Sequence, residues 1–161
     1  MILPILIPVS AGELVDKITI LRVKAARIEA AKRANVVKEL ALLEAVAATE
    51  LAEVHDLAEL AAELEAVNAR LWDIEEAKRD CERRQDFGSA FIDVARAVYI
   101  QNDRRAAIKR RINAAAGSEL ARAERTTSKA LAPPIRPSKG ISADFSPPVA
   151  ERYATSTGSA C

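Results

Sequence analysis

The longest uninterrupted stretch of this chain runs from Asn35 to about Arg84, fifty residues without a glycine or a proline. Apolar side chains recur along it in steps of three and four, which places them on one face of a helix. These positions are Leu40, Leu43, Ala47, Leu51, Val54, Leu57, Leu60, Leu64, Val67, Leu71 and Ile74. We interpret the stretch as one long helix or two collinear ones, which would extend over about 75 Å at ~1.5 Å per residue. Other segments must cover so long a rod, because no compact domain of this size buries it alone.

Shorter helical patterns flank this stretch. Ser10 and Glu13 have the spacing of a capping box, and an apolar seam follows them. The seam consists of Leu14, Ile18, Leu21, Ala25 and Ile28. Asn35 marks a turn, since asparagine tolerates left-handed dihedral angles and can also cap a helix. A second turn falls at residues 85–89, where Gly88 supplies unusual dihedral angles, and Gly117 ends the last helix.

The sequence therefore predicts an all-α fold, an antiparallel three-helix arrangement around one long central helix. The helices are expected at 11–33, 36–84 and 88–115. Because short turns join antiparallel neighbours, the far ends near Ser10 and Asn113 should meet close to Leu57. Each half of the rod would then have only two helices, which predicts a homodimer that completes a bundle of four or more.

The two ends of the chain differ from this helical domain, which we place at 1–118. Pro4 and Pro8 hold the first nine residues extended, so we expect an arm or edge strand lying on apolar surface. This segment has neither the pattern of a signal peptide nor the length of a membrane span. From Thr126 onward, five prolines and ten serines or threonines predict a disordered tail within 119–161.

Charge and residue usage exclude several function classes. The net charge of +1 gives no overall attraction to nucleic acid or membrane. Residues 34–86 hold fourteen acidic and six basic side chains between two basic segments, which indicates either internal complementarity or solvated faces. Cys81 and Cys161 form no disulfide framework or metal-ligand spacing, and His55 is the one histidine. We therefore expect reduced thiols, a cytoplasmic location, no metal and no cofactor.

Two polar groups interrupt the apolar pattern. Trp72 stands beside three carboxylates, those of Asp73, Glu75 and Glu76. Acid/base chemistry is one interpretation, and pairing with Lys78 and Arg79 one turn away is the favoured one.

Further along, Asn102 and Asp103 form a polar seam where the apolar face should continue after Val98. A polar residue on a seam usually sets register or specificity.

A more specific functional hypothesis is an anion-binding pocket. Ser10 and Gly12 begin a helix whose free amides and dipole attract a phosphate or carboxylate. Lys17, Arg110 and Arg111 would add positive charge there, and a phosphorylated small molecule such as a sugar nucleotide is the expected ligand. The alternative, in which Ser10 only caps the helix and the arginines are solvated, is favoured.

Three blocks of the sequence resemble a bacterial family of short helical proteins that is catalogued as a domain of unknown function. The blocks are 8–21 (PVSAGELVDKITIL), 71–75 (LWDIE) and 98–113 (VYIQNDRRAAIKRRIN). The resemblance covers about residues 1–118. It implies a place beside, or fused to, glycosyltransferase-like proteins of surface-polysaccharide synthesis, and it implies no catalytic residues.

The function expected from all this is that of a non-enzymatic helical interaction module with a protein partner. The residues offer no nucleophile with a partner base, no metal cluster and no phosphate loop. Nucleic acid is not an expected partner, because the acidic helix is the natural neighbour of 104–111 and aromatic residues are scarce. The alternative is an anion- or sugar-nucleotide-binding protein, or a small helical enzyme, with its site at the pocket described above.

Overall fold

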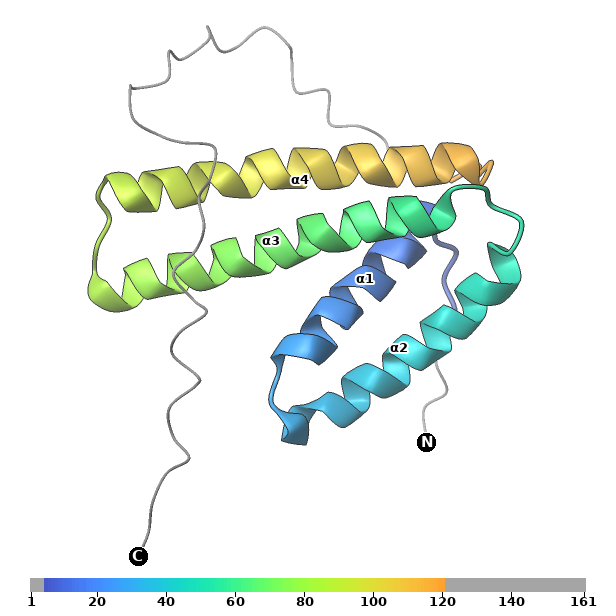
Figure 1. The fold of residues 1–161 in the computed structure, drawn as a ribbon, viewed down its shortest axis with the longest axis horizontal. Coiled ribbons are helices and arrows are strands. Elements are labelled where there is room, and N and C mark those ends of the chain that lie inside the picture. Colours follow the sequence, from blue (N-terminus) through green and yellow to red (C-terminus); the bar gives the residue numbers. More distant parts are fainter. Residues whose placement is uncertain (1–4, 121–161) are drawn as a thin grey trace, which may run out of the picture. The chain divides into compact units, whose positions relative to one another are not determined.

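The computed structural model describes residues 5–120, which all belong to one compact unit, Met1–Ala123. It contains four helices: α1 (Ala11–Arg27), α2 (Ala30–Glu50), α3 (Leu57–Arg84) and α4 (Ser89–Ala115) (Figure 1). The all-α class is confirmed, and no strand occurs in the described part of the chain. The expectations for residues 1–4 and for a disordered tail over 121–161 lie outside the described residues.

The helix expected at 36–84 is two helices, and they are not collinear. α2 ends at Glu50, and after residues 51–56 the chain folds back into α3 (Figure 1). The turn contains no glycine, and Asp56 takes the left-handed conformation instead, with φ of 59°. Folding back lets Leu51 on one side of the turn and Leu60 on the other enter the same apolar core, which a straight rod would keep far apart.

The first turn also lies elsewhere than expected. α1 ends at Arg27, Ile28 is extended with ψ of 158°, and α2 begins at Ala30. Asn35, the predicted turn residue, is an exposed position inside α2. The earlier turn returns α2 along α1, where the bases of α1 meet the acids of α2. The pairs are Lys17–Glu39 at 3.1 Å and Arg22–Glu44 at 2.7 Å.

The central helix of the unit is α1, not the long segment. α1 packs against α2, α3 and α4, whereas α2 contacts no other described helix than α1. More than one face of α1 is accordingly buried: Gly12, Leu14, Val15, Asp16, Ile18, Thr19, Leu21 and Val23. The apolar core around it consists of Leu14, Val15, Ile18, Leu51, Leu60, Leu64, Ile108 and Ile112.

The remaining turns show which residues carry the unusual dihedral angles. Between α3 and α4 it is Gln85, with φ of 53°, that is left-handed. Gly88 has φ of −73°, and its amide donates to Asp86 Oδ1 at 3.2 Å, so the role predicted for Gly88 is wrong. Gly117 follows α4 with φ of 59°, as expected of a helix stop.

Residues 5–9 form an arm before α1 that belongs to no helix or strand. The arm is exposed and lies on no apolar surface of its own chain, so that part of the expectation is not met. Among the described helices, none has both the length and the apolar character needed to cross a membrane.

Candidate functional site

The chemical centre of the helical unit is the buried carboxylate of Asp16 on α1. Arg105 of α4 donates to both of its oxygens, from Nε to Oδ1 at 2.9 Å and from Nη2 to Oδ2 at 2.6 Å. Lys109, one turn further along α4, places Nζ 3.1 Å from Oδ2. A carboxylate removed from water needs such paired positive charges to remain ionised.

Neutral side chains complete the shell around this ion pair. Asn68 of α3 donates from Nδ2 to Asp16 Oδ1 at 3.0 Å and to Thr19 Oγ1 at 2.9 Å. The Thr19 hydroxyl in turn donates to the Asp16 carbonyl at 2.9 Å. No buried polar side-chain atom among the described residues lacks a partner. The Asp16 network, as we call Asp16, Thr19, Asn68, Arg105 and Lys109, therefore joins α1, α3 and α4.

The network determines the charge state of Asp16. Burial by itself would raise the pKa of this carboxyl, but the hydrogen bonds from Arg105 and Asn68 and the charges of Arg105 and Lys109 outweigh it. The net result is a pKa below the ordinary aspartate value. Asp16 is therefore a carboxylate at neutral pH.

The sequence did not reveal this network, because Asp16 lies outside the single apolar seam expected on this helix. The signal that could have found it is the spacing of Gly12, Asp16, Thr19 and Val23. These positions recur at four, three and four, which marks a second helix face.

The amino end of α1 meets the carboxyl end of α4, as predicted. The Gly12 amide donates to Asn113 Oδ1 at 2.6 Å. A Cβ at Gly12 would lie only 2.6 Å from the Lys109 carbonyl oxygen. Ser10 caps α1 by accepting from the Glu13 amide at 3.3 Å. The Glu13 carboxylate pairs with Lys109 at 2.7 Å instead of reaching back to complete the capping box.

Two of the basic residues proposed for an anion pocket pair with acidic residues of other helices. Lys17 pairs with Glu39 of α2, and Arg111 pairs with Glu63 of α3 at 2.5 Å. Arg110 is not free either. Anion binding at Ser10 and Gly12 stays a prediction, and these ion pairs favour the internal charge complementarity suggested by the alternating basic and acidic segments.

A groove lies next to the Asp16 network. Its volume is about 350 Å³, and α1, α3 and α4 all contribute to its lining. The lining residues are Ile20, Val23, Asn68, Leu71, Trp72, Glu75, Glu76, Arg79, Asn102 and Arg105. Asn68 and Arg105 belong to both the groove and the network, so the Asp16 contacts hold part of the groove wall in place.

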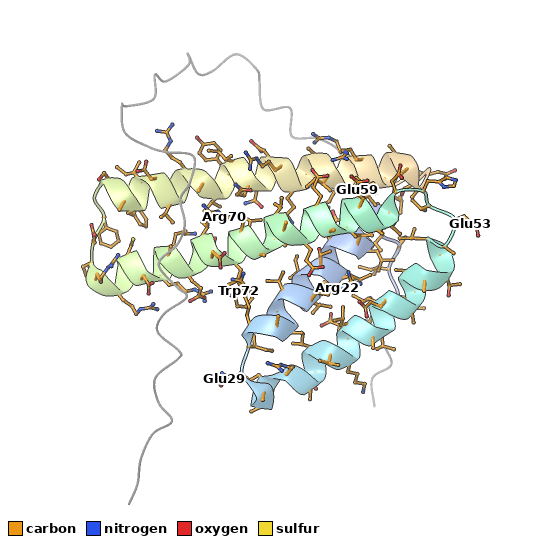
Figure 2. The ribbon with its side chains drawn as sticks, viewed as in Figure 1. Arg22, Glu29, Glu53, Glu59, Arg70 and Trp72 are labelled. Atoms are coloured by element: carbon orange, nitrogen blue, oxygen red, sulfur yellow. The ribbon has the colours of Figure 1, made fainter. Side chains whose placement is uncertain are left out.

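The apolar part of this groove is lined by Ile20, Val23, Leu71 and Trp72, the only tryptophan of the chain. Figure 2 shows Trp72 projecting from α3 on the side that faces the carboxyl end of α1. Two of the neighbouring carboxylates are engaged within α3, Glu75 with Lys78 at 3.1 Å and Glu76 with Arg79 at 2.9 Å, whereas Asp73 pairs with Arg27 of α1. The first two are the one-turn pairs expected from the sequence.

The polar seam on α4 is only partly a groove feature. Asn102 and Asp103 are both exposed, but Asn102 lines the groove and donates from Nδ2 to the Val98 carbonyl at 3.0 Å. His55 is exposed and Cys81 is buried. Within residues 5–120 no group of histidine, cysteine, aspartate and glutamate side chains could hold a metal ion.

Comparisons with protein families, with characterised proteins and with solved structures find no match to this chain. The chemistry of the site must therefore be judged from its residues. Its charged groups largely neutralise one another, and its accessible surface combines an indole with aliphatic side chains. Such a groove can bind by shape and apolar contact, with polar groups at its rim.

Replacing Asp16 by asparagine should destabilise the fold strongly. The Asp16→Asn variant leaves Arg105 and Lys109 without their shared counterion, which typically costs about 3–5 kcal/mol. Glu39→Gln is the matched control, because it removes the exposed Lys17–Glu39 pair and should cost less than about 1 kcal/mol. Urea denaturation followed by circular dichroism measures both, and equal losses would contradict the structural role of Asp16.

The same carboxyl predicts an acid-sensitive component of stability. The pKa of Asp16 is lower in the folded chain than in the unfolded chain. Ionised Asp16 therefore stabilises the fold fully at pH values above its pKa in the unfolded chain. That contribution is lost as the pH falls from about 4 through the lower folded pKa. The wild type should therefore lose its stability advantage over Asp16→Asn in this range. A constant difference between pH 7 and pH 2.5 would contradict the assignment.

Gly12→Ala tests how closely α1 and α4 approach. The new methyl group would meet the backbone carbonyl of Lys109, which cannot rotate away, so we expect a loss of about 1–3 kcal/mol. Gly88→Ala is the control, because its Cβ would meet only the Asp86 side chain, at 3.3 Å. Thermal melts should show a clear decrease for Gly12→Ala and little change for Gly88→Ala. A reversed order would contradict the close packing.

Proposed function

We propose that this chain is a non-enzymatic helical interaction module, and that it binds a helix of a protein partner in the groove beside Trp72. The observation that carries the proposal is the position of the groove. α1 packs as a third helix against α3 and α4. It ends at Arg27, which pairs with Asp73 of α3. α3 continues from there to Arg84 and returns as α4 without further cover from α1 or α2 (Figure 1).

The uncovered part of the α3–α4 hairpin has the composition of an incomplete bundle. Ile74 and Cys81 are buried between the two helices. Phe87, Ile92 and Tyr99 are large apolar side chains that remain exposed. Two helices alone bury too little apolar surface to form a core, and helix bundles normally add a third or fourth. A partner helix would occupy the position that α1 leaves vacant.

The groove has the chemistry of helix recognition. An amphipathic helix binds by placing its apolar face in a hydrophobic groove, while polar residues at the rim set orientation. Here Leu71 and Trp72 supply the apolar wall, and tryptophan is the residue type most often found at energetic centres of interfaces. Glu75, Glu76 and Arg79 line the same groove and offer both signs of charge to the flanks of an incoming helix.

The electrostatics of the unit favour a protein-binding module over an enzyme or a nucleic-acid-binding protein. Asp16 is a poor general base at neutral pH, because a base works best with a pKa near the working pH. Arg105 and Lys109 pair with the buried Asp16, and Arg111 pairs with Glu63 on the surface, which lowers the positive charge available to a nucleic acid. The resemblance described above suggests the pathway, so we take a cytoplasmic, glycosyltransferase-like protein of surface-polysaccharide synthesis as the partner.

Substitution of Trp72 tests the proposal. Wild-type protein, Trp72→Ala and Leu42→Ala would each be used as bait in an extract of the native host. The wild type and Leu42→Ala should retain the same partner, and Trp72→Ala should lose it. Leu42 is the control, because it is an exposed apolar residue of α2 that neither lines the groove nor belongs to the α3–α4 hairpin.

A binding experiment with a peptide then identifies the contact. A synthetic helix from the retained partner should bind the wild type with a Kd about 30-fold lower than its Kd for Trp72→Ala, the usual effect of removing an interface tryptophan. Because the chain has one tryptophan, binding should also change the emission of Trp72 directly. A partner retained equally by Trp72→Ala, or a bait that recovers only RNA or a metabolite, would overturn the proposal.

A further inference from the structure

The outer side of α4 carries a single apolar stripe. α4 lies along one edge of the unit and, among the described helices, packs against α3 and α1 alone (Figure 1). Ile92, Tyr99 and Ala106 recur at intervals of seven, which is nearly two full turns, so they stay within about 40° on one side of the helix. Ile92 and Tyr99 are each 53% exposed, and Ala106 is exposed as well. We call these three residues the α4 stripe; the buried Ile108 and Ile112 lie on the opposite side of the helix.

Two charged side chains, Arg96 and Asp103, flank this stripe. Each follows a member of the stripe by four residues, so both lie on the same side of it. Within residues 5–120, neither side chain forms an ion pair or a hydrogen bond. On α3, by contrast, the bases Lys78, Arg79 and Arg83 all pair with acids one turn away. The two charges beside the α4 stripe are therefore available to another molecule.

We infer that two copies of this chain form an antiparallel dimer by packing their α4 stripes together, with the two-fold axis at Tyr99. Ile92 stands seven residues before Tyr99 and Ala106 seven residues after it. The axis therefore places Ile92 of each copy opposite Ala106 of the partner subunit, so a large side chain faces a small one at both ends. The two Tyr99 rings meet at the axis, where an aromatic pair adds to the apolar contact. Each copy uses its stripe once, which leaves no further copy to add.

The flanking charges match each other in this arrangement. Arg96 is three residues before the axis and Asp103 is four residues after it. In the antiparallel pair, Arg96 of one copy thus lies within one residue, about 1.5 Å along the helix, of Asp103 of the partner subunit. Symmetry forms this pair twice. A parallel pair in the same register would instead bring arginine to arginine and aspartate to aspartate, which is unfavourable.

A second copy is the occupant that this pattern selects. The stripe needs a partner helix with a small residue opposite Ile92, a large one opposite Ala106, an acid opposite Arg96 and a base opposite Asp103. α4 itself, turned end for end, has all four. The interface is also separate from the groove beside Trp72. On α4 that groove is lined by residues 102 and 105, which lie about 60° and 120° round the helix from Tyr99, so this inference does not rest on the proposed partner helix.

Analytical ultracentrifugation is the first test. A contact of one helix per copy is small, so we expect a dissociation constant on the order of 10 μM, and the wild type at about 200 μM should sediment with twice the 17.4 kDa mass of one chain. Arg96→Glu and Asp103→Arg each place like charges together twice in a dimer, which should raise the constant about 10-fold. Lys38→Glu is the matched control, because it makes the same change of charge at an exposed position of α2. Lys38→Glu and Trp72→Ala should dimerise as the wild type does, and circular dichroism checks that all variants keep the same helix content.

Mixing the two charge variants distinguishes this register from any other dimer. In a dimer of one Arg96→Glu chain with one Asp103→Arg chain, both pairs across the axis again join opposite charges. The mixture should therefore form a heterodimer with about the wild-type dissociation constant. The double variant Arg96→Glu/Asp103→Arg should form a homodimer equally well.

Four results would overturn the inference. They are a wild type that is monomeric at this concentration, a dimer that neither charge variant weakens, a mixture no tighter than each variant alone, and a dimer lost in Trp72→Ala. A monomeric wild type that retains a protein from the host extract, where Arg96→Glu does not, would assign the α4 stripe to a different protein instead of a second copy.

Discussion

The buried charge of Asp16 is the constraint on which the rest of the unit depends. A carboxylate with almost no access to water is tolerated only when its oxygens are paired and hydrogen-bonded. Here three helices are needed to meet that condition, since α1 provides the acid, α4 the two bases and α3 the amide of Asn68. If any of these helices moved by a few ångströms, the charge would be left uncompensated in the interior. The network therefore penalises wrong arrangements more than it adds to stability.

The polar contacts between α1 and α4 also define their register. On α4, Arg105, Lys109 and Asn113 follow one another at intervals of four and share one face. They meet Asp16, Glu13 and Gly12, which run the opposite way along α1. Apolar contacts alone would accept a shift by one helical turn, because aliphatic side chains are interchangeable in shape over such a step. A shift of one turn here would place Gly12 beside a different side chain and leave Asp16 with one base instead of two.

The sequence predicted the features that depend on local chemistry. The Ser10 cap, the Gly117 stop and the one-turn pairs around Trp72 all follow from residue types and short spacings. The meeting of the amino end of α1 with the carboxyl end of α4 was predicted from the short turns between antiparallel helices. It did not predict the break at residues 51–56, because that turn has no glycine or proline and Asp56 takes the strained conformation. What favours the break is long-range burial of Leu51 and Leu60, which no local pattern records. Asp16 was missed for a related reason, since α1 has neighbours on more than one side and an analysis that assumes one apolar seam assigns its other faces to solvent.

The turn at residues 51–56 determines both how the core is packed and which helix surfaces it leaves uncovered. If the chain had continued as a single rod, α1 and α4 would have lain along different halves of it, and Asp16 would have had no access to Arg105. Folding back at residues 51–56 brings α1, α3 and α4 together at the amino end of α3 and moves α2 to the outside of α1. The other helices do not cover the whole length of α3, because α1 has seventeen residues whereas α3 has twenty-eight. The distal half of α3 and the outer side of α2 remain uncovered for the same geometric reason. The groove that we propose for a partner helix therefore lies where the core that Asp16 organises comes to an end.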